Sequence, residues 1–337
     1  MIWRTSLLIV LIAAGSLFAV LGIDYHRFET TPITLAGHST IIDIPRGTSL
    51  LVLAQRLTDQ GILRHPYYFI ALAYFQGGQS RIKAGEFELT ATMTPPQMLQ
   101  RIMSGQVVEY SITLVEGWTY QQALAAIDAH PRFGGDGLAQ LSGEMLMTQL
   151  GRPGEHPEGR FFPDTYRFPG KTRGLAVLSR ALERMERILA DEWAQRRADL
   201  PISTPYEALI LASIIEKETA VAAERPQIAG VFVRRLQQGM RLQTDPTVIY
   251  GLGDRFDGNL RRADLREANP YNTYLIKGLP PTPIALPGRD AIRAALHPQN
   301  GDSLYFVAKG DGSHEFSGTL DAHNQAVRRY LLERQSP

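Results

Sequence analysis

The chain has 337 residues, of which 44% are hydrophobic and 20% charged, so it is long enough to bury a sizeable core and to form two or three domains. Its 35 basic and 34 acidic residues leave a formal net charge of +1, which argues against nucleic acid as a partner. Cysteine is absent, which excludes disulfides, thiolate zinc sites and a lipid-modified N-terminal cysteine.

The first predicted element is an uncharged stretch of 18 residues, Ser6–Ile23. It is about the minimum length for a helix that crosses a bilayer and is long for the apolar core of a signal peptide. The small residues Ala13–Ser16 could mimic a signal-peptide cleavage site, but the apolar run continues beyond them through Leu21. We therefore expect residues 1–24 to form a cytoplasmic tip and a retained membrane helix. Basic flanking residues are too few to decide its orientation, and the short N-terminal tail favours an exported body.

Residues 25–113 are predicted to form small strand–helix modules, because segments of alternating apolar residues are followed by segments with helical periodicity. Thr94 and Pro95 are typical of a helix start, and Gly61 and Gly105 of helix ends. The expected strands are Ile41–Ile44, Glu86–Leu89 and Val107–Val115, and the expected helices run through Leu50–Leu57 and Met98–Ile102.

This region is similar to LysM domains, which bind the sugar backbone of cell-wall polymers. A generic α+β spacer fits the same pattern, since a fold alone does not fix a function. Tyr67, Tyr68 and Tyr74 could stack on sugars, although tyrosines at helical spacing more often pack into a core.

The next segment begins with Gly117–Thr119, which leads into a helix containing Leu124 and Ile127. Further on, Pro163 and Asp164 are expected to initiate a turn within an aromatic loop. A polar, Arg- and Glu-rich stretch from Leu175 to Leu200 is predicted to be a helix with a solvated face.

Two acids end an apolar helix that begins at Thr204, the expected N-cap, with Glu207 placed to complete a capping box. Only Ser213 is polar between Ala208 and Ile215, so the helix is predicted to be buried on most sides. A glutamate where water is scarce keeps its proton to higher pH and can serve as a general acid near neutrality.

Helical spacing does not choose between Glu216 and Glu218. Glu218 continues the face of Leu211, whereas Glu216 continues the face of Leu209, and both faces are apolar. The simpler interpretation is a solvated pair at a fraying helix end.

The following chain is dense in turns. A helix is expected over Pro226–Gln238, and Asp245 is expected to be the N-cap of another helix ahead of Pro246. Amide and hydroxyl groups in Asn269–Tyr274 lie beside a proline-rich loop, Gly278–Gly288, which suits a cleft for sugars. The chain closes with two expected strands, Ser303–Ala308 and His314–Phe316, and a helix from about Leu320 to Leu332.

These segments together resemble the endolytic murein transglycosylase (YceG-like) family. The resemblance runs from the membrane helix to near the C-terminus. It is carried by Ala212–Thr219 (ASIIEKET), Arg241–Tyr250 (RLQTDPTVIY), Tyr271–Tyr274 (YNTY), Gly278–Pro281 (GLPP), Glu158–Tyr166 (EGRFFPDTY) and Leu304–Val307 (LYFV).

The resemblance implies a lyase anchored in the inner membrane, with its N-terminus in the cytoplasm and its body in the periplasm or cell-wall space. The expected fold is α+β, with a membrane helix, a LysM-like subdomain and a mixed α+β catalytic domain over 114–337, whose core is 201–337. Its implied partners are peptidoglycan glycan strands and the penicillin-binding synthases that polymerise them. No cofactor and no metal are expected.

The catalytic residue implied by the resemblance is Glu218. As a hypothesis, it protonates the glycosidic oxygen between N-acetylmuramic acid and N-acetylglucosamine and then accepts the proton of the sugar's own 6-hydroxyl, giving a 1,6-anhydro end. Glu216 either raises the proton affinity of Glu218 or is structural. The candidate sugar contacts are Gln243, Thr244, Asp245, Tyr271, Asn272 and Glu216.

Two alternatives stay open on the sequence. A glycan hydrolase would use a second carboxylate, for which Asp245 and Asp254 are candidates. A noncatalytic membrane-tethered factor that binds peptidoglycan is the other. The chain has neither a His-Glu-x-x-His pair nor a Gly-x-Ser-x-Gly elbow, which argues against zinc-protease and serine-nucleophile chemistry.

Overall fold

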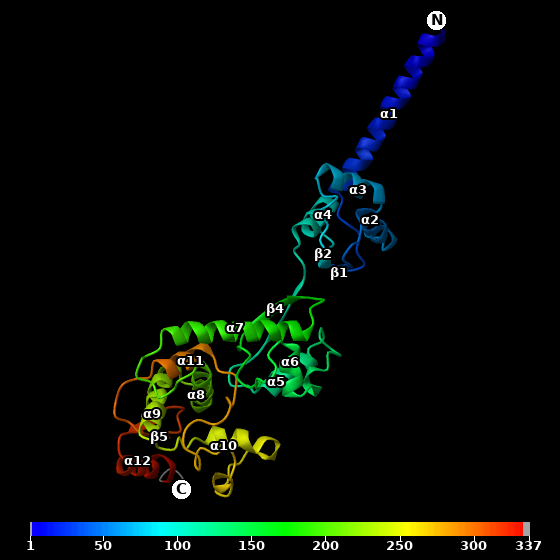
Figure 1. The fold of residues 1–337 in the computed structure, drawn as a ribbon. Helices are drawn as coiled ribbons and strands as arrows, with labels where there is room; N and C mark the ends of the chain where they lie inside the picture. Colours follow the sequence, from blue (N-terminus) through cyan, green and yellow to red (C-terminus); the bar gives the residue numbers. More distant parts are fainter. Residues whose placement is uncertain (1, 333–337) are drawn as a thin grey trace. The chain divides into compact units, whose positions relative to one another are not determined.

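The structure is a computed structural model that describes residues 2–332, and its fold is mixed α+β (Figure 1). The chain divides into two compact units. Unit 1 holds the chain up to Tyr110 together with Arg167–Lys171, and unit 2 holds Ser111–Tyr166 together with the chain from Thr172 onward. The change of unit at Tyr110 falls in strand β3 (Glu109–Thr113), which pairs with β4 (Thr165–Pro169), and the domain boundary after residue 113 stays a prediction.

Helix α1 (Ile2–Thr30) is the long apolar helix of unit 1. Its segment Ser6–Thr30 is long and apolar enough to cross a membrane, and none of its most apolar window is buried in the protein. The predicted helix over Ser6–Ile23 lies within it. An apolar segment of this length that is not buried in the protein fits a membrane span.

The core of unit 1 forms between one two-stranded sheet and three helices. Strand β1 (Ser39–Ile44) pairs antiparallel with β2 (Gly85–Thr90), with Ile42 opposite Phe87. The helices are α2 (Leu50–Asp59), α3 (Pro66–Phe75) and α4 (Pro95–Ser104). The predicted strands and helices of this region are confirmed, and α3 is an additional helix. The largest fully buried side chains of this sheet and these three helices are those of Ile44, Leu57, Phe69, Leu72, Phe87, Leu89, Met98, Leu99 and Ile102.

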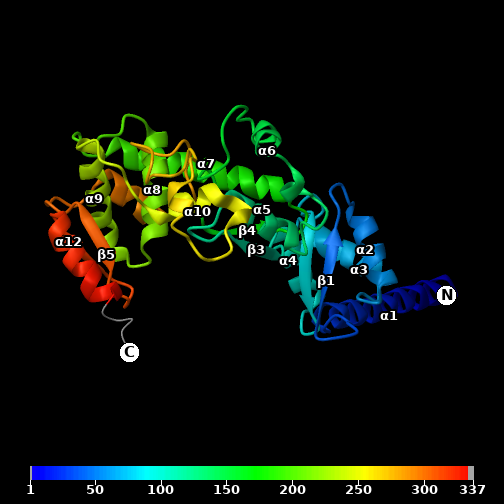
Figure 2. The same ribbon diagram turned by 90° about the horizontal axis from the view of Figure 1, so that it is seen from below.

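Unit 2 is mainly helical. Its helices are α5 (Tyr120–Ala129), α6 (Gly143–Gln149), α7 (Gly174–Ala194), α8 (Pro205–Glu218), α9 (Arg225–Gln237), α10 (Asp245–Leu252), α11 (Arg289–Leu296) and α12 (Leu320–Val327). Short 3₁₀ turns cover Leu138–Gln140, Ala222–Glu224, Gly253–Arg255 and Asp264–Arg266, and a π-helical turn, Arg328–Leu332, follows α12. Strands β5 (Tyr305–Ala308) and β6 (His314–Ser317) pair antiparallel, and α12 lies beside β5 (Figure 2).

Some predicted elements are longer than the observed ones. Helix α7 ends at Ala194 rather than at Leu200, and β3 spans five residues inside the predicted Val107–Val115. The sequence predicts the last helix over Leu320–Leu332; in the structure the α-helix ends at Val327, and a π-helical turn covers Arg328–Leu332.

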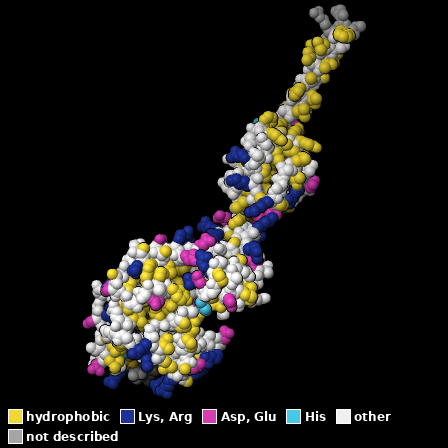
Figure 3. Space-filling view, in the orientation of Figure 1, with side chains coloured by type: hydrophobic (Ala, Val, Ile, Leu, Met, Phe, Trp, Pro, Cys, Tyr) yellow, Lys and Arg dark blue, Asp and Glu magenta, His cyan; other side chains and the backbone are white. Residues whose placement is uncertain are grey.

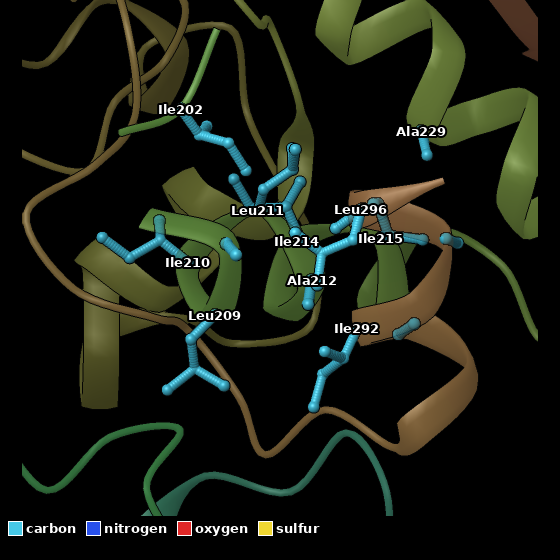
Figure 4. Packing of buried hydrophobic residues seen from close by; sticks show 14 of the residues in the cluster. Ile202, Leu209, Ile210, Leu211, Ala212, Ile214, Ile215, Ala229, Ile292 and Leu296 are labelled. Carbon is cyan, nitrogen blue, oxygen red and sulfur yellow. The ribbon is translucent and has the colours of Figure 1, made fainter. Parts of the chain in front are cut away.

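Helix α8 lies at the centre of unit 2, between α7, α9 and α11. The capping box is present: the Thr204 hydroxyl accepts from the Glu207 amide at 3.2 Å, and the Glu207 carboxylate accepts from the Thr204 amide at 3.2 Å. Every residue from Ala208 to Ile215 is buried, as predicted, and their side chains meet those of α11 (Figure 4). Each large apolar side chain removed from water in this way contributes about 1.5–3 kcal/mol.

Ser213, the polar residue within α8, connects the helix to the proline-rich loop. Its hydroxyl donates to the Ile210 carbonyl at 2.7 Å and accepts from the Ile284 amide at 3.0 Å. A buried hydroxyl satisfied on both sides carries little cost. The loop therefore keeps a fixed position against α8.

Glu158 is a buried carboxyl at the start of α5. Its Oε1 accepts from the amide of Tyr120, the first residue of α5, at 2.9 Å and from that of Gly159 at 3.3 Å. Burial raises the pKa of Glu158 to about 7, although these hydrogen bonds act in the opposite direction. Gly159 has a φ of +78°, and a Cβ there would lie 2.6 Å from Pro283, so only glycine fits this contact.

The substitution Glu158→Gln is expected to change how stability depends on pH. The folded protein holds the Glu158 proton up to about pH 7, whereas the ordinary pKa is 4.5. The free energy of unfolding therefore falls as pH rises from 4.5 to 7. Glutamine keeps the oxygen that accepts from Tyr120 but has no proton to lose. The free energy of unfolding of the variant, measured relative to that of wild type, should therefore be about 3 kcal/mol higher at pH 8 than at pH 4.

The measurement is urea unfolding at a series of pH values. Glu183→Gln is the matched control, because Glu183 is exposed on α7 and its loss should leave the pH dependence unchanged. An identical pH dependence in wild type and Glu158→Gln would contradict the expectation.

Candidate active site

Glu218 is the last residue of α8, which ends because Thr219 turns to extended backbone. Its side chain is partly exposed, and its Oε1 accepts a hydrogen bond from the Thr244 hydroxyl. Burial raises the pKa of Glu218 to about 7, and the charge of Asp245 acts in the same direction. The Thr244 hydrogen bond, His314 and Arg235 act in the opposite direction. This carboxyl can thus exchange a proton near neutral pH.

A buried hydroxyl network holds Thr244 against Glu218. Thr273 connects the two segments: its carbonyl accepts from the Gln243 amide and its Oγ1 from the Thr244 amide, each at 3.1 Å. The hydroxyl of Thr247 lies 2.9 Å from that of Thr273. Gln243 has a φ of +51°, the one left-handed value outside glycine among residues 2–332. Such strain persists only where neighbouring contacts enforce it, as they do here.

The prediction that Asp245 is an N-cap is wrong. Thr244 is the N-cap of α10, and Asp245 is the first helical residue. The Asp245 Oδ1 instead accepts from the Tyr274 hydroxyl at 2.6 Å. The carboxylate of Asp245 borders the same cavity as Glu218.

Arg235 of α9 lines this cavity and bonds to two backbone segments around it. Its Nε donates to the Leu304 carbonyl and its Nη1 to the Leu242 carbonyl, both at 2.7 Å. Burial lowers the pKa of Arg235. The cavity measures about 420 Å³, and its polar lining consists of Glu218, Arg235, Gln243, Thr244, Asp245, Tyr274, Tyr305, His323 and Asn324.

Glu216 fastens the end of α8 to its surroundings. Its Oε2 accepts from the Gly288 amide at 2.9 Å, and its Oε1 from Arg225 at 3.1 Å. Only 6% of its side chain is exposed, and burial raises its pKa. Both oxygens are therefore used by the protein. Glu216 and Glu218 border a second cavity of about 540 Å³, together with Trp118, Gln122, Lys217 and Arg225.

Tyr271 and Asn272 support the loop rather than line either cavity beside Glu218. Asn272 is fully buried, and its Nδ2 donates to the carbonyls of three residues in the 3₁₀ turn and just after it, at 2.8–3.3 Å. Its Oδ1 accepts from the Tyr274 amide at 3.0 Å. The Tyr271 hydroxyl pairs with that of Thr282 at 2.9 Å. The structure thus gives these two residues a different place from the sugar contact expected of them.

Three features of the site escape sequence reasoning. Arg235 and His314 influence Glu218 from elements distant in the sequence, and Glu158 lines a third cavity of about 880 Å³ with Tyr120, Gln122, Lys217, Tyr250 and Asp254. Asp254 therefore borders this third cavity, whereas Asp245 borders that of Glu218. One sequence signal indicates that Arg235 is buried. It lies four and three residues after the apolar Val231 and Phe232, on the same face of the helix.

The chain matches the YceG-like family over residues 42–329. It is 32% identical over 324 residues to a Bacillus subtilis (strain 168) protein named endolytic murein transglycosylase, which covers 91% of this chain and 89% of that protein. A protein of the same name from Streptococcus pneumoniae serotype 2 is 25% identical over 360 residues, covering 96% of this chain and 64% of that protein.

A crystal structure of a yceG-like protein from Listeria monocytogenes has the same fold, with a TM-score of 0.53 and 29% identity. The match covers 86% of this chain and 100% of that one. The extent of the family match, together with the relative that is 32% identical over most of both chains, establishes the relationship. The chain belongs to the YceG-like family.

Proposed function

We propose that this chain is an endolytic murein transglycosylase that cleaves the β-1,4 bond between N-acetylmuramic acid and N-acetylglucosamine inside peptidoglycan strands. The observation that carries the proposal is Glu218, a carboxyl with a pKa of about 7 that borders two cavities at the end of a buried helix. The names of the Bacillus and Streptococcus relatives support the same class of reaction.

In the proposed reaction Glu218 acts first as acid and then as base. Its proton moves to the glycosidic oxygen as the bond from that oxygen to C1 of the muramic acid breaks. The resulting carboxylate takes the proton of the 6-hydroxyl of the same sugar, whose oxygen forms the new bond to C1. The two products together contain every atom of the substrate, and no water is consumed. A second catalytic carboxylate is unnecessary because the nucleophile belongs to the substrate.

The residues around Glu218 are suited to this cycle. The Thr244 hydroxyl donates to Oε1 and stabilises the carboxylate, while Asp245 and burial favour the protonated form. These opposing effects place the pKa where both proton transfers occur at neutral pH. We assign the Oε2 atom of Glu218 to the substrate, because Thr244 already uses Oε1.

An endolytic enzyme has to hold the strand on both sides of the bond that it cuts. The cavity with Gln243 and Asp245 and the cavity with Trp118 and Gln122 share Glu218 as a lining residue. We assign sugar contacts to Gln243 and Asp245 on one side and to Trp118 on the other. Glu216, Tyr271 and Asn272 are assigned to positioning, since their polar atoms are bound within the protein.

We also propose that α1 anchors the protein in the inner membrane, with the N-terminus in the cytoplasm and unit 2 in the cell-wall space. Its apolar segment Ser6–Thr30 supports this assignment. The anchor would keep the site near strands released by membrane-bound penicillin-binding synthases. The LysM-like character of unit 1 remains a prediction, and it would supply a second contact with the same strands.

Glu218→Gln is expected to fold normally and to lose essentially all cleavage, because the amide neither donates the required proton nor accepts the second one. The measurement is digestion of uncrosslinked glycan strands by the full chain, with product masses read by mass spectrometry. Wild type should release anhydro ends. Glu183→Gln, an exposed acid on α7, is the matched control and should keep full activity.

Normal release of anhydro products by Glu218→Gln would refute its role. Wild-type products heavier by one water would indicate a hydrolase with a second carboxylate, for which Asp245 and Asp254 are the candidates. A complete lack of cleavage by the wild type, with glycan binding retained, would favour the noncatalytic factor.

The pH profile of kcat/KM is expected to fall as pH rises through about 7, because Glu218 must start protonated. Two substitutions should move this limb in opposite directions. Thr244→Val removes a hydrogen bond that lowers the pKa of Glu218 and should move the limb to higher pH. Asp245→Asn removes a negative charge that raises it and should move the limb to lower pH.

The position of the limb is compared, not its height, so that a loss of substrate contacts does not obscure the result. Glu158→Gln serves as the control, because the pKa of Glu158 is also raised to about 7 and the limb should stay in place without it. Shifts of the same sign in the Thr244 and Asp245 variants would refute the assignment of the limb to Glu218.

A further inference from the structure

Helix α3 is apolar on its outer face as well as its inner one. Its sequence, Pro66–Phe75 (PYYFIALAYF), contains no charged residue and no amide side chain. Phe69, Leu72 and Ala73 are buried in the core of unit 1. Tyr67, Tyr74 and Phe75 point outward and are 73%, 62% and 82% exposed. A helix on the surface of a water-soluble domain ordinarily carries a polar outer face, so this face needs an apolar neighbour.

The outer face of α3 lies beside the C-terminal end of α1, Asp24–Phe28, which is called the foot of α1 below. The Tyr25 ring of α1 is 5.6 Å from that of Tyr68 and 6.5 Å from that of Phe75, between ring centres. The Tyr68 hydroxyl donates to Asp24 at 3.0 Å, and the Phe28 ring is 5.6 Å from that of Tyr68. Figure 3 shows hydrophobic side chains along α1 that continue onto the surface at its foot, where α3 lies in Figure 1.

The length of α1 sets the level of this contact relative to a bilayer. Ser6 to Tyr25 is a run of 20 residues, which rises about 30 Å as a helix, the thickness of the hydrocarbon core. Tyr25 therefore reaches the boundary between hydrocarbon and headgroups, and Phe75 stands beside it. Tyrosine and other aromatic side chains gather at this level because they combine an apolar ring with a polar edge.

Charged groups next to the aromatic face fit the same level. Arg27 and Arg64 are both exposed, and they line a cavity at the foot of α1 together with Asp24 and His65. Basic side chains just outside the hydrocarbon core interact favourably with lipid phosphates. A sugar-binding face would instead need several fixed polar partners around its aromatic rings, and α3 offers only tyrosine hydroxyls.

We propose that Tyr67, Tyr74 and Phe75 of α3 lie in the headgroup region of the bilayer that α1 crosses. The inference rests on the proposed membrane anchor. Unit 1 then contacts the membrane through two elements, the crossing helix and the surface of α3. Two contacts fix the tilt and rotation of unit 1 on the membrane, which one helix alone leaves free.

The test uses the absence of cysteine in the chain. Single cysteines are introduced in the full chain as Tyr67→Cys and Phe75→Cys, labelled with a nitroxide and reconstituted in phosphatidylethanolamine–phosphatidylglycerol vesicles. Phe18→Cys reports whether α1 is inserted. Arg46→Cys is the aqueous control. The Ser39 end of β1 lies near the C-terminal end of α1, and Arg46 follows the other end of β1.

Collision of each label with oxygen, which partitions into lipid, is compared with collision with a water-soluble nickel chelate. Nickel collisions at positions 67 and 75 should be severalfold lower than at position 46, and oxygen collisions higher. The label at position 18 should show the strongest protection from nickel. Cleavage of glycan strands by the same samples is measured separately, so the catalytic proposal stands or fails on its own.

The inference would be overturned if the labels at positions 67 and 75 were as accessible to nickel as the label at position 46. Protection of the label at position 18 would then still support the membrane anchor. Exposure at position 18 would overturn both. Protection at 67 and 75 that appears only on adding purified glycan strands would identify a sugar-binding face instead. Protection that grows with the protein-to-lipid ratio would identify a contact between copies of the chain.

Discussion

The burial of α8 is the constraint on which the site depends. Its residues Ala208–Ile215 are enclosed by α7, α9 and α11, so the helix neither tilts nor slides without opening the core of unit 2. Glu218 inherits this fixed position, one turn beyond the last apolar residue. Glu216 reinforces it through Gly288 and Arg225. A carboxyl placed in this way is partly withheld from water by the helix that carries it, and its proton affinity follows from its position.

The second half of the site is built by loops, and it depends on α8 as a fixed wall. Thr273 holds both Gln243 and Thr244, so two segments about 30 residues apart act as one rigid support. Ser213 fixes the proline-rich loop to α8 in a similar way. Several polar groups of these loops are bonded within the protein, among them those of Tyr271, Asn272 and Thr273. The polar side chains that remain around Glu218 are those that line its cavity.

Sequence reasoning succeeded where local physics decides the outcome. The capping box at Thr204, the buried run after it and the apolar α1 follow from short-range patterns, and the structure contains all three. It failed where a distant partner decides. Thr273 bonds to both Gln243 and Thr244, and Thr244 rather than Asp245 is the N-cap of α10. Thr273 is about 30 residues away along the chain, beyond the reach of a local pattern. The tyrosines of α3 divide, with Tyr68 packed against the core and Tyr67 and Tyr74 exposed, a division that helical spacing left open.

The left-handed backbone of Gln243 has a thermodynamic meaning for the whole loop. Glycine would adopt this conformation freely, whereas a residue with a side chain gives up about 1 kcal/mol or more. Glycine would also widen the range of conformations open to the loop when it is not engaged. Glutamine at this position therefore costs folding free energy, and it also leaves the loop fewer conformations than glycine would. The hydroxyl that faces Glu218 is then in place before any substrate arrives, and binding need not spend energy to order it.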